Sequence, residues 1–100
     1  MNTNENNDKM LSILLVEDDK AACEEIENYI DSCENVRLTG VTNNSDEALE
    51  LVKYHLPDAV ILDLELHNGG GNGLLFLLGL SKLDLPYRPY ILITTNNSSE

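Results

Sequence analysis

The sequence predicts a single α/β domain in which a parallel sheet is covered by helices on both faces. Short, nearly continuous apolar runs alternate along the chain with longer segments whose apolar residues recur at helical spacing. Such runs are typical of strands that are buried on both sides. Alternation of this kind implies right-handed crossovers between parallel strands. One hundred residues leave room for only one such domain.

The first part of the chain is a polar leader followed by a strand and a helix. Residues 1–9 are polar and rich in asparagine, so we expect a disordered leader before a domain over residues 10–100. The apolar run Leu11–Val16 predicts the first strand. In Lys20–Cys33 the apolar residues fall on one side and the glutamates on the other, which predicts an amphipathic helix.

The middle of the chain repeats this strand and helix pattern. Val36–Thr42 is rich in β-branched residues and predicts the second strand. Turn and capping residues at positions 43–45 then open a second amphipathic helix, which Pro57 ends. A third strand is predicted over Ala59–Leu64, where one carboxylate, that of Asp63, interrupts a buried-type run.

The last part of the chain is a glycine-rich loop, a helix and a strand. The loop spans His67–Gly73, the third helix is predicted over Leu74–Leu83, and the fourth strand over Tyr90–Thr94. The third helix is apolar around its whole circumference. This pattern suggests a contact with another protein, for which the candidate residues are Phe76, Leu77 and Leu80.

Composition narrows the class of partner. The chain is 42% hydrophobic, and its 18 acidic and 6 basic residues give a net charge of −12. This balance disfavours binding to nucleic acid or to an anionic membrane surface and favours cations. No run is long enough to span a bilayer, and Cys23 and Cys33 fall about 15 Å apart along one helix, too far for a disulfide. We therefore expect a cytoplasmic protein with reduced thiols.

Acidic residues follow the predicted strands at one edge of the sheet. Glu17, Asp18 and Asp19 come directly after the first strand, and Asp63 lies at the end of the third. The carboxyl ends of parallel strands share one edge, so these carboxylates should converge. Crowded carboxylates repel one another unless a cation lies between them, which predicts Mg²⁺ or another hard divalent ion such as Mn²⁺.

Three motifs resemble those of the receiver domains of two-component response regulators, the CheY-like superfamily. ILLVEDD is similar to the acidic end of the first strand, PDAVILDLEL to the phosphoacceptor strand and PYILITT to the strand that carries the switch threonine. The resemblance covers residues 10–96. It implies a flavodoxin-like, doubly wound parallel sheet of order 2-1-3-4-5, with the fifth strand and the last helices missing from this chain.

The resemblance also implies a role for each matching residue. Asp63 matches the phosphoacceptor. The metal ligands would be Asp18, Asp63, the backbone carbonyl of Glu65 and, through water, Glu17. Thr94 matches the switch hydroxyl that binds the phosphoryl group, and Thr95 matches the small residue that guards access to it. Asp19 remains a spare acid and is expected to cap the first helix.

The chain departs from the family pattern in two places. The usual proline after the phosphoacceptor strand is absent, His67 stands there, and the glycine-rich loop is longer, so we expect a loop that is mobile without metal. The chain also ends before the fifth strand and its essential lysine. We expect either a fragment of a longer protein or a fourth-strand edge that a partner chain covers.

These features favour a signalling switch that accepts a phosphoryl group from a sensor histidine kinase and changes a protein-interaction surface. Its phosphorylation and dephosphorylation would be self-catalysed, and it would not be an enzyme acting on metabolites. The alternative is a phosphorylation-independent pseudo-receiver that acts as an interaction or dimerisation module, through the third helix or the fourth-strand edge. A flavodoxin-type cofactor binder is disfavoured because acids follow the first strand, and a haloacid-dehalogenase-type phosphatase because its pair of aspartates is absent.

Overall fold

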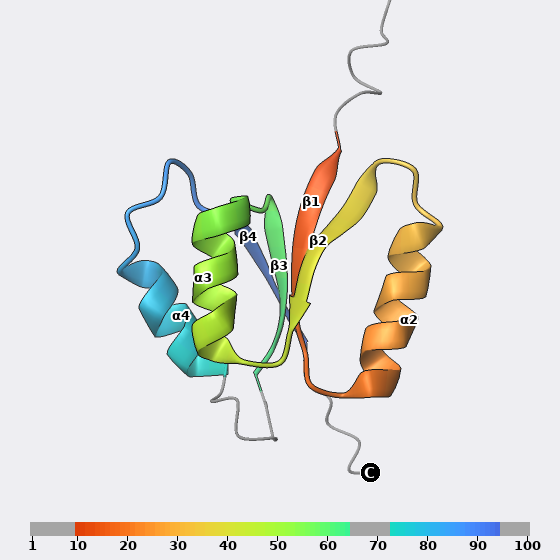
Figure 1. Cartoon of the computed structure of the whole chain (residues 1–100), viewed down its shortest axis with the longest axis horizontal. Helices are drawn as coiled ribbons and strands as arrows, with labels where there is room; N and C mark the ends of the chain where they lie inside the picture. The colour runs from red at the N-terminus through yellow and green to blue at the C-terminus, as the bar shows by residue number, and fades with distance from the viewer. Residues whose placement is uncertain (1–9, 65–72, 95–100) are drawn as a thin grey trace, which may run out of the picture.

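The computed structural model describes residues 10–64 and 73–94, in which strands and helices alternate (Figure 1). The elements in chain order are β1 (Leu11–Val16), α2 (Lys20–Asp31), β2 (Val36–Thr42), α3 (Ser45–His55), β3 (Ala59–Asp63), α4 (Gly73–Ser81) and β4 (Tyr90–Thr94). The expected leader, the expected roles of Glu65 and Thr95, and the expected mobility of the loop before Gly73 fall outside the described residues.

The four strands form one parallel sheet in the order β2-β1-β3-β4. This order confirms the α/β class and the first four positions of the predicted 2-1-3-4-5 arrangement. Strand β1 lies in the middle between β2 and β3, and its register with β2 shifts once, between Ile13 and Leu14. The carboxyl ends of β1 and β3 are therefore neighbours.

Helices cover both faces of the sheet (Figure 1). Helices α3 and α4 lie together on one face, and α2 lies on the other. The largest buried cluster joins β1 and β3 to α3 and α4; it consists of Leu14, Val16, Ala48, Val52, Val60, Leu62, Phe76 and Leu80. Successive side chains of β1 and β3 point to opposite faces of the sheet, so every second one lies in this core.

The bounds of the helices follow from local capping. Asn44 precedes α3, and its side chain accepts a hydrogen bond from the backbone N–H of Glu47 at 2.9 Å, as the predicted capping chemistry requires. At the other end Leu56 adopts a left-handed conformation with φ of 50° before Pro57. Helix α4 ends at Ser81, earlier than predicted, where the Arg88 guanidinium donates to the carbonyl oxygens of Leu80 and Leu83 at 2.6 and 2.8 Å.

The prediction of a contact surface on the third helix is wrong for two of its three residues, Phe76 and Leu80. Phe76 is fully buried and Leu80 is 6% exposed, because both pack into the core against the sheet. Leu77 is partly buried against the same core. The side chains of α4 that reach solvent are instead Leu74, Leu75 and Leu78.

Strand β4 is the edge strand of the described sheet, as the sequence predicts. Tyr90, Leu92 and Ile93 are each more than half exposed along it. None of the described helices combines the length and the apolar character that crossing a membrane requires.

Candidate metal centre

Three carboxylates meet at the carboxyl edge of the sheet. Val16 pairs with Leu62 in the β1–β3 register, so the residues that follow them, Glu17 and Asp63, lie side by side. One carboxylate oxygen from each of Glu17, Asp18 and Asp63 lies within 4.8 Å of the other two. The convergence of these acids, predicted from their places after two separate strands, is therefore confirmed.

Two of these three acids are removed from solvent. Glu17 is 4% exposed and Asp63 is 1% exposed, whereas Asp18 is half-buried. Burying like charges this close together raises the free energy of the folded chain unless something neutralises them. The charged form of the cluster is therefore unfavourable unless a proton or a bound cation neutralises part of it.

The pKa of the Glu17 carboxyl is shifted by this environment. Its pKa is raised from the ordinary value of 4.5 to about 7, chiefly because burial penalises the charged form. The carboxyls of Asp63 and Asp18 also raise it, while the backbone N–H of Asp19, which donates to Glu17 Oε2 at 3.1 Å, works in the opposite direction. Near neutral pH the cluster thus holds a proton that a divalent cation can displace.

The main chain of Glu17 is fixed from two sides. Its N–H donates to the carbonyl oxygen of Thr42 at 2.9 Å, and its carbonyl oxygen accepts from the Cys23 thiol at 3.6 Å. Burial raises the pKa of that thiol, so it stays protonated and remains a donor. The turn between β1 and α2 is in this way tied to β2 on one side and to the helix on the other.

Asp19 occupies the N-cap position of α2, as expected, but without the expected side-chain capping bond. Its carbonyl oxygen accepts the first helical hydrogen bond, from the N–H of Cys23 at 2.9 Å. Its own N–H instead serves the Glu17 carboxylate. The backbone of Asp19 therefore opens the helix and orients an acid of the cluster at the same time.

Thr94 lies beside Asp63 at the end of the neighbouring strand. The two residues are paired in the β3–β4 register. The Thr94 hydroxyl donates to the carbonyl oxygen of Leu62 at 3.5 Å, which is the outer limit of a hydrogen bond. The hydroxyl is therefore close to the acids and weakly held. Glu65 and Thr95, the other two predicted site residues, lie outside the described residues.

Gly73 brings the start of α4 against the end of β3, a contact that sequence reasoning missed. A Cβ atom at this position would lie 2.7 Å from Leu64 Cα and 2.9 Å from the carbonyl oxygen of Asp63. The Gly73 N–H donates to the carbonyl oxygen of Leu64 at 3.1 Å. The available signal was the place of this glycine, at the boundary between the loop and the helix.

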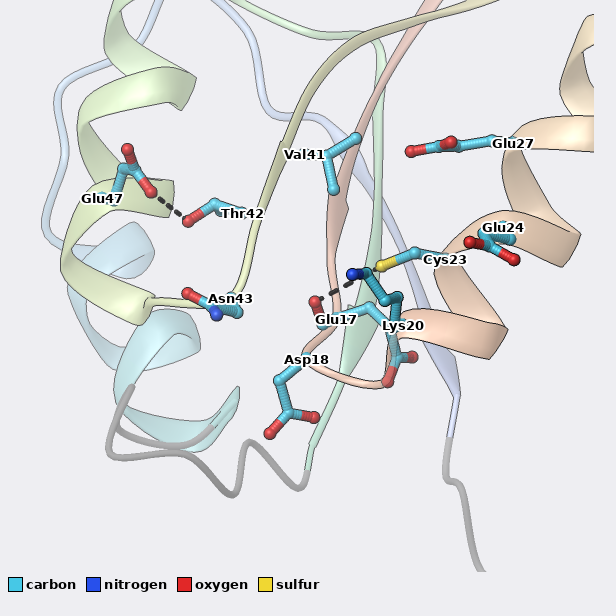
Figure 2. Close-up of a pocket in the computed structure, with 10 residues that line it drawn as sticks. All are labelled: Glu17, Asp18, Lys20, Cys23, Glu24, Glu27, Val41, Thr42, Asn43 and Glu47. Atoms are coloured by element: carbon cyan, nitrogen blue, oxygen red, sulfur yellow. Dashed lines mark hydrogen bonds between the residues drawn. The ribbon is translucent and has the colours of Figure 1, made fainter.

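A cavity of about 500 Å³ opens beside the cluster (Figure 2). Residues of the β1–α2 turn and of α2 line one part of it, and the end of β2 with the start of α3 lines the rest; they are Glu17, Asp18, Lys20, Cys23, Glu24, Glu27, Val41, Thr42, Asn43 and Glu47. Five of these ten are acidic and one is basic, so the cavity attracts cations to the side of the cluster formed by Glu17 and Asp18.

The donor set fits a hard divalent cation. It consists of oxygen atoms alone, from three carboxylates close enough to share one ion. Mg²⁺ is typically held by one or two carboxylates together with water, and the adjoining cavity is large enough to contain such water. Asp18 and Asp63 would hold the ion, with Glu17 close by.

Comparison with known proteins identifies the family to which this fold belongs. Residues 13–100 match the family model described as response regulator receiver domain. The chain belongs to the response regulator receiver family. It is a receiver domain of the two-component type, a class of signalling domain rather than a conventional enzyme, and its sheet is the CheY-like, flavodoxin-like sheet.

The relatives that match this receiver domain are longer than it is. It is 28% identical over 86 residues to the transcriptional regulatory protein BtsR of Escherichia coli, an alignment that covers 86% of this chain and 34% of BtsR. The response regulator domain of Thermotoga maritima CheB superposes with a TM-score of 0.76 at 22% identity, over 92% of this chain and 65% of that one. The receiver domain of Mycobacterium tuberculosis NarL superposes with a TM-score of 0.77 at 22% identity, over 91% of this chain and 70% of that one. The chain thus spans about a third of its curated relative.

Proposed function

We propose that this receiver domain accepts a phosphoryl group on Asp63 from a sensor histidine kinase, with a divalent cation at the acidic cluster, and then alters a protein-interaction surface. The observation that supports this most directly is the convergence of Glu17, Asp18 and Asp63 within 4.8 Å. A structural role does not require three acids at one strand edge, two of them buried. The kinase partner places the domain in the cytoplasm.

In this proposal the cation is Mg²⁺ or Mn²⁺. Asp18 and Asp63 would hold it directly and Glu17 through water, and the resemblance to receiver domains implies that Glu65 would contribute its backbone carbonyl oxygen. When bound, the cation supplies the positive charge that offsets the carboxylates and the oxygens of the transferring group. The raised pKa of Glu17 means that a proton leaves the cluster as the cation enters.

The residues of this chain then perform the transfer. A carboxylate oxygen of Asp63 forms a bond to phosphorus while the bond from phosphorus to the donor imidazole nitrogen breaks. The electron pair of that bond stays on the nitrogen, and the imidazole leaves in its neutral form with its proton on the other ring nitrogen. The burial of Asp63 excludes most competing water from the acyl phosphate, so that its hydrolysis is slow enough for signalling.

The Thr94 hydroxyl is suited to respond to the phosphoryl group. It lies beside Asp63 and its present acceptor, the carbonyl oxygen of Leu62, is 3.5 Å away. A phosphoryl oxygen is a stronger acceptor, so the hydroxyl turns toward it and Thr95 controls access to the group. Movement of Thr94 then displaces the exposed part of β4, where Leu92 and Ile93 form a ready contact surface.

The test is labelling by a small phosphodonor, acetyl phosphate, with and without Mg²⁺. We expect the wild type to form an acid-stable, base-labile phosphoprotein only with the cation, and Asp63→Asn to lose more than 99% of the label. Asp58→Asn is the matched control, because Asp58 adjoins the other end of β3. Equal labelling of wild type and Asp63→Asn would contradict the assignment.

The exposed β4 edge favours one alternative, a pseudo-receiver that binds partners without being phosphorylated. Tyr90 is 81% exposed and Leu92 54% exposed on this edge. Such a module would show no Mg²⁺-dependent label in any variant and would keep its partner or dimer contact in Asp63→Asn. The labelling experiment therefore separates the two functions.

A further inference from the structure

The outer surface of α4 is apolar and uncharged, although the helix lies at the periphery of the molecule beside α3 (Figure 1). Leu74, Leu75 and Leu78 are 59%, 53% and 60% exposed. Positions 74 and 78 are one turn apart, and 75 and 78 are three residues apart, so the three side chains share one face. We call these three leucines and Lys82 the outer α4 face.

The inner contacts of α4 are already satisfied by the rest of the domain. Phe76 and Leu80 pack into the core, and Gly79 approaches Leu49 of α3 so closely that a Cβ atom there would meet Leu49 Cδ1 at 2.5 Å. The outer leucines therefore contribute little to the packing of the helix on the sheet. A surface helix ordinarily carries polar residues at such positions.

The charge distribution points to a second copy of this chain as the occupant. Each copy carries a net charge of −12, so two copies repel one another wherever acidic surfaces meet. Helix α4 has no charged residue from Gly73 to Ser81, and the next residue is the basic Lys82. Two copies can approach through residues 73–81 without bringing carboxylates of the helix together, and the next acid in the chain, Asp84, lies beyond Lys82.

The face is also self-complementary when two helices pair in opposite directions. The N-terminal end of α4 packs against Asp63 through Gly73, so this end lies at the acidic edge of the domain. Lys82 lies at the other end of the helix. A two-fold antiparallel pairing places Lys82 of each copy toward the acidic edge of the other and stacks the leucines between them.

We propose that the outer α4 face mediates reversible self-association of this chain as an antiparallel α4 pair. The surface is small, because three half-exposed leucines and one lysine are well below the ~800 Å² per partner of a stable interface. The dimer is therefore weak, with a dissociation constant on the order of 100 μM. This inference does not depend on phosphorylation of Asp63.

The test is sedimentation velocity of the whole chain from about 10 to 1,000 μM, together with amide chemical shifts recorded over the same range. The wild type should show a concentration-dependent rise in sedimentation coefficient, with shift changes concentrated in residues 74–82. Leu78→Glu should weaken association at least tenfold, and Lys82→Glu should weaken it about threefold. Leu92→Glu, on the equally exposed β4 edge, should associate as the wild type does.

Circular dichroism of each variant shows whether it is folded. If Leu78→Glu is unfolded, Leu74→Gln replaces it, with an expected loss of about threefold. A wild type that stays monomeric at 1,000 μM would overturn the proposal. So would association that Leu92→Glu abolishes and Leu78→Glu leaves intact, because that result assigns the interface to β4.

Discussion

Two aspartates adjoin the opposite ends of β3, and their surroundings differ completely. At the amino end, the Asp58 carboxylate accepts from the Ser12 N–H at 2.8 Å and from the Ser12 hydroxyl at 3.3 Å. At the carboxyl end, Asp63 lies among other acids, with carboxylate oxygens of Glu17 and Asp18 within 4.8 Å. The first aspartate joins two strands, and the second is surrounded by like charge.

This difference teaches that the residue type alone does not mark the functional acid. Asp58 is half-buried and its charge is matched by donors of the neighbouring strand, so it stabilises the fold. Asp63 is 1% exposed in a place where its charge is costly. In the proposed function this buried acid, and not Asp58, meets the cation and accepts the phosphoryl group.

The largest expected effect comes from a substitution that disrupts the packing of the start of α4 against the carboxyl end of β3. Gly73→Ala places a methyl group 2.7 Å from Leu64 Cα and 2.9 Å from the Asp63 carbonyl oxygen, and both are backbone atoms that cannot turn aside. We expect the free energy of unfolding to fall by about 3 kcal/mol. Chemical denaturation of the metal-free chain measures it.

Gly79→Ala is the matched control in the same helix. Its Cβ would meet the end of the Leu49 side chain, which can rotate, and alanine favours the helix over glycine by about 1 kcal/mol. The shift of Leu49 offsets that gain, so Gly79→Ala should be nearly neutral and the two variants should differ by roughly 3 kcal/mol. Equal stability of the two would mean that the close approach at Gly73 is unimportant.

The next prediction exchanges each aspartate for its neutral isostere. Asp58→Asn removes the charge from two hydrogen bonds with Ser12 and should destabilise the chain by about 1 kcal/mol. Asp63→Asn removes one of three neighbouring negative charges and should stabilise the metal-free chain by about 1 kcal/mol. Urea unfolding at pH 8 in the presence of a chelator measures both. If both substitutions changed the free energy of unfolding in the same direction, the two ends of β3 would not differ in this way.

The pH dependence of the free energy of unfolding offers a further test of the carboxyl end. The folded pKa of Glu17, about 7, exceeds the ordinary 4.5, so the folded chain binds more protons between these values. The contribution of Glu17 is therefore full below pH 4.5, is lost as the pH rises to 7 and is absent above it. We expect a loss of roughly 1–2 kcal/mol over this interval from Glu17.

Glu17→Gln should flatten that profile, and saturating Mg²⁺ should restore stability at pH 8 because the cation takes the place of the proton. Urea midpoints at pH 4.5, 6 and 8 provide the measurement. A wild type and a Glu17→Gln variant with parallel pH profiles would show that Glu17 does not carry the shifted proton.

Much of the fold was predictable because the residue pattern shows where the strands begin and end. Leu11–Val16 is a continuous apolar run that stops at an acid, and the structure begins and ends β1 at the same residues. The acids of the cluster were predictable for the same reason, since each directly follows or closes a buried strand. The order of the strands came from the resemblance to receiver domains.

Other features depend on contacts between distant residues and could not be predicted from local patterns. The bond between Ser12 and Asp58 joins residues 46 apart. The end of α4 is bonded by Arg88, whose guanidinium reaches back eight residues to the carbonyl oxygen of Leu80, a contact that no helical periodicity indicates. Phe76 and Leu80 were wrongly expected at a contact surface, because a helix that is apolar all round has no periodic pattern to indicate which side meets the sheet.

The most direct test of the shared-cation site is a calorimetric titration of Mn²⁺ into the wild type, Asp18→Asn and Asp58→Asn at pH 7.5. We predict one Mn²⁺ site in the wild type, at least tenfold weaker Mn²⁺ binding in Asp18→Asn, and unchanged Mn²⁺ binding in Asp58→Asn. Binding of equal strength in all three chains, or none in the wild type, would contradict the claim that the acids at the carboxyl edge share a cation.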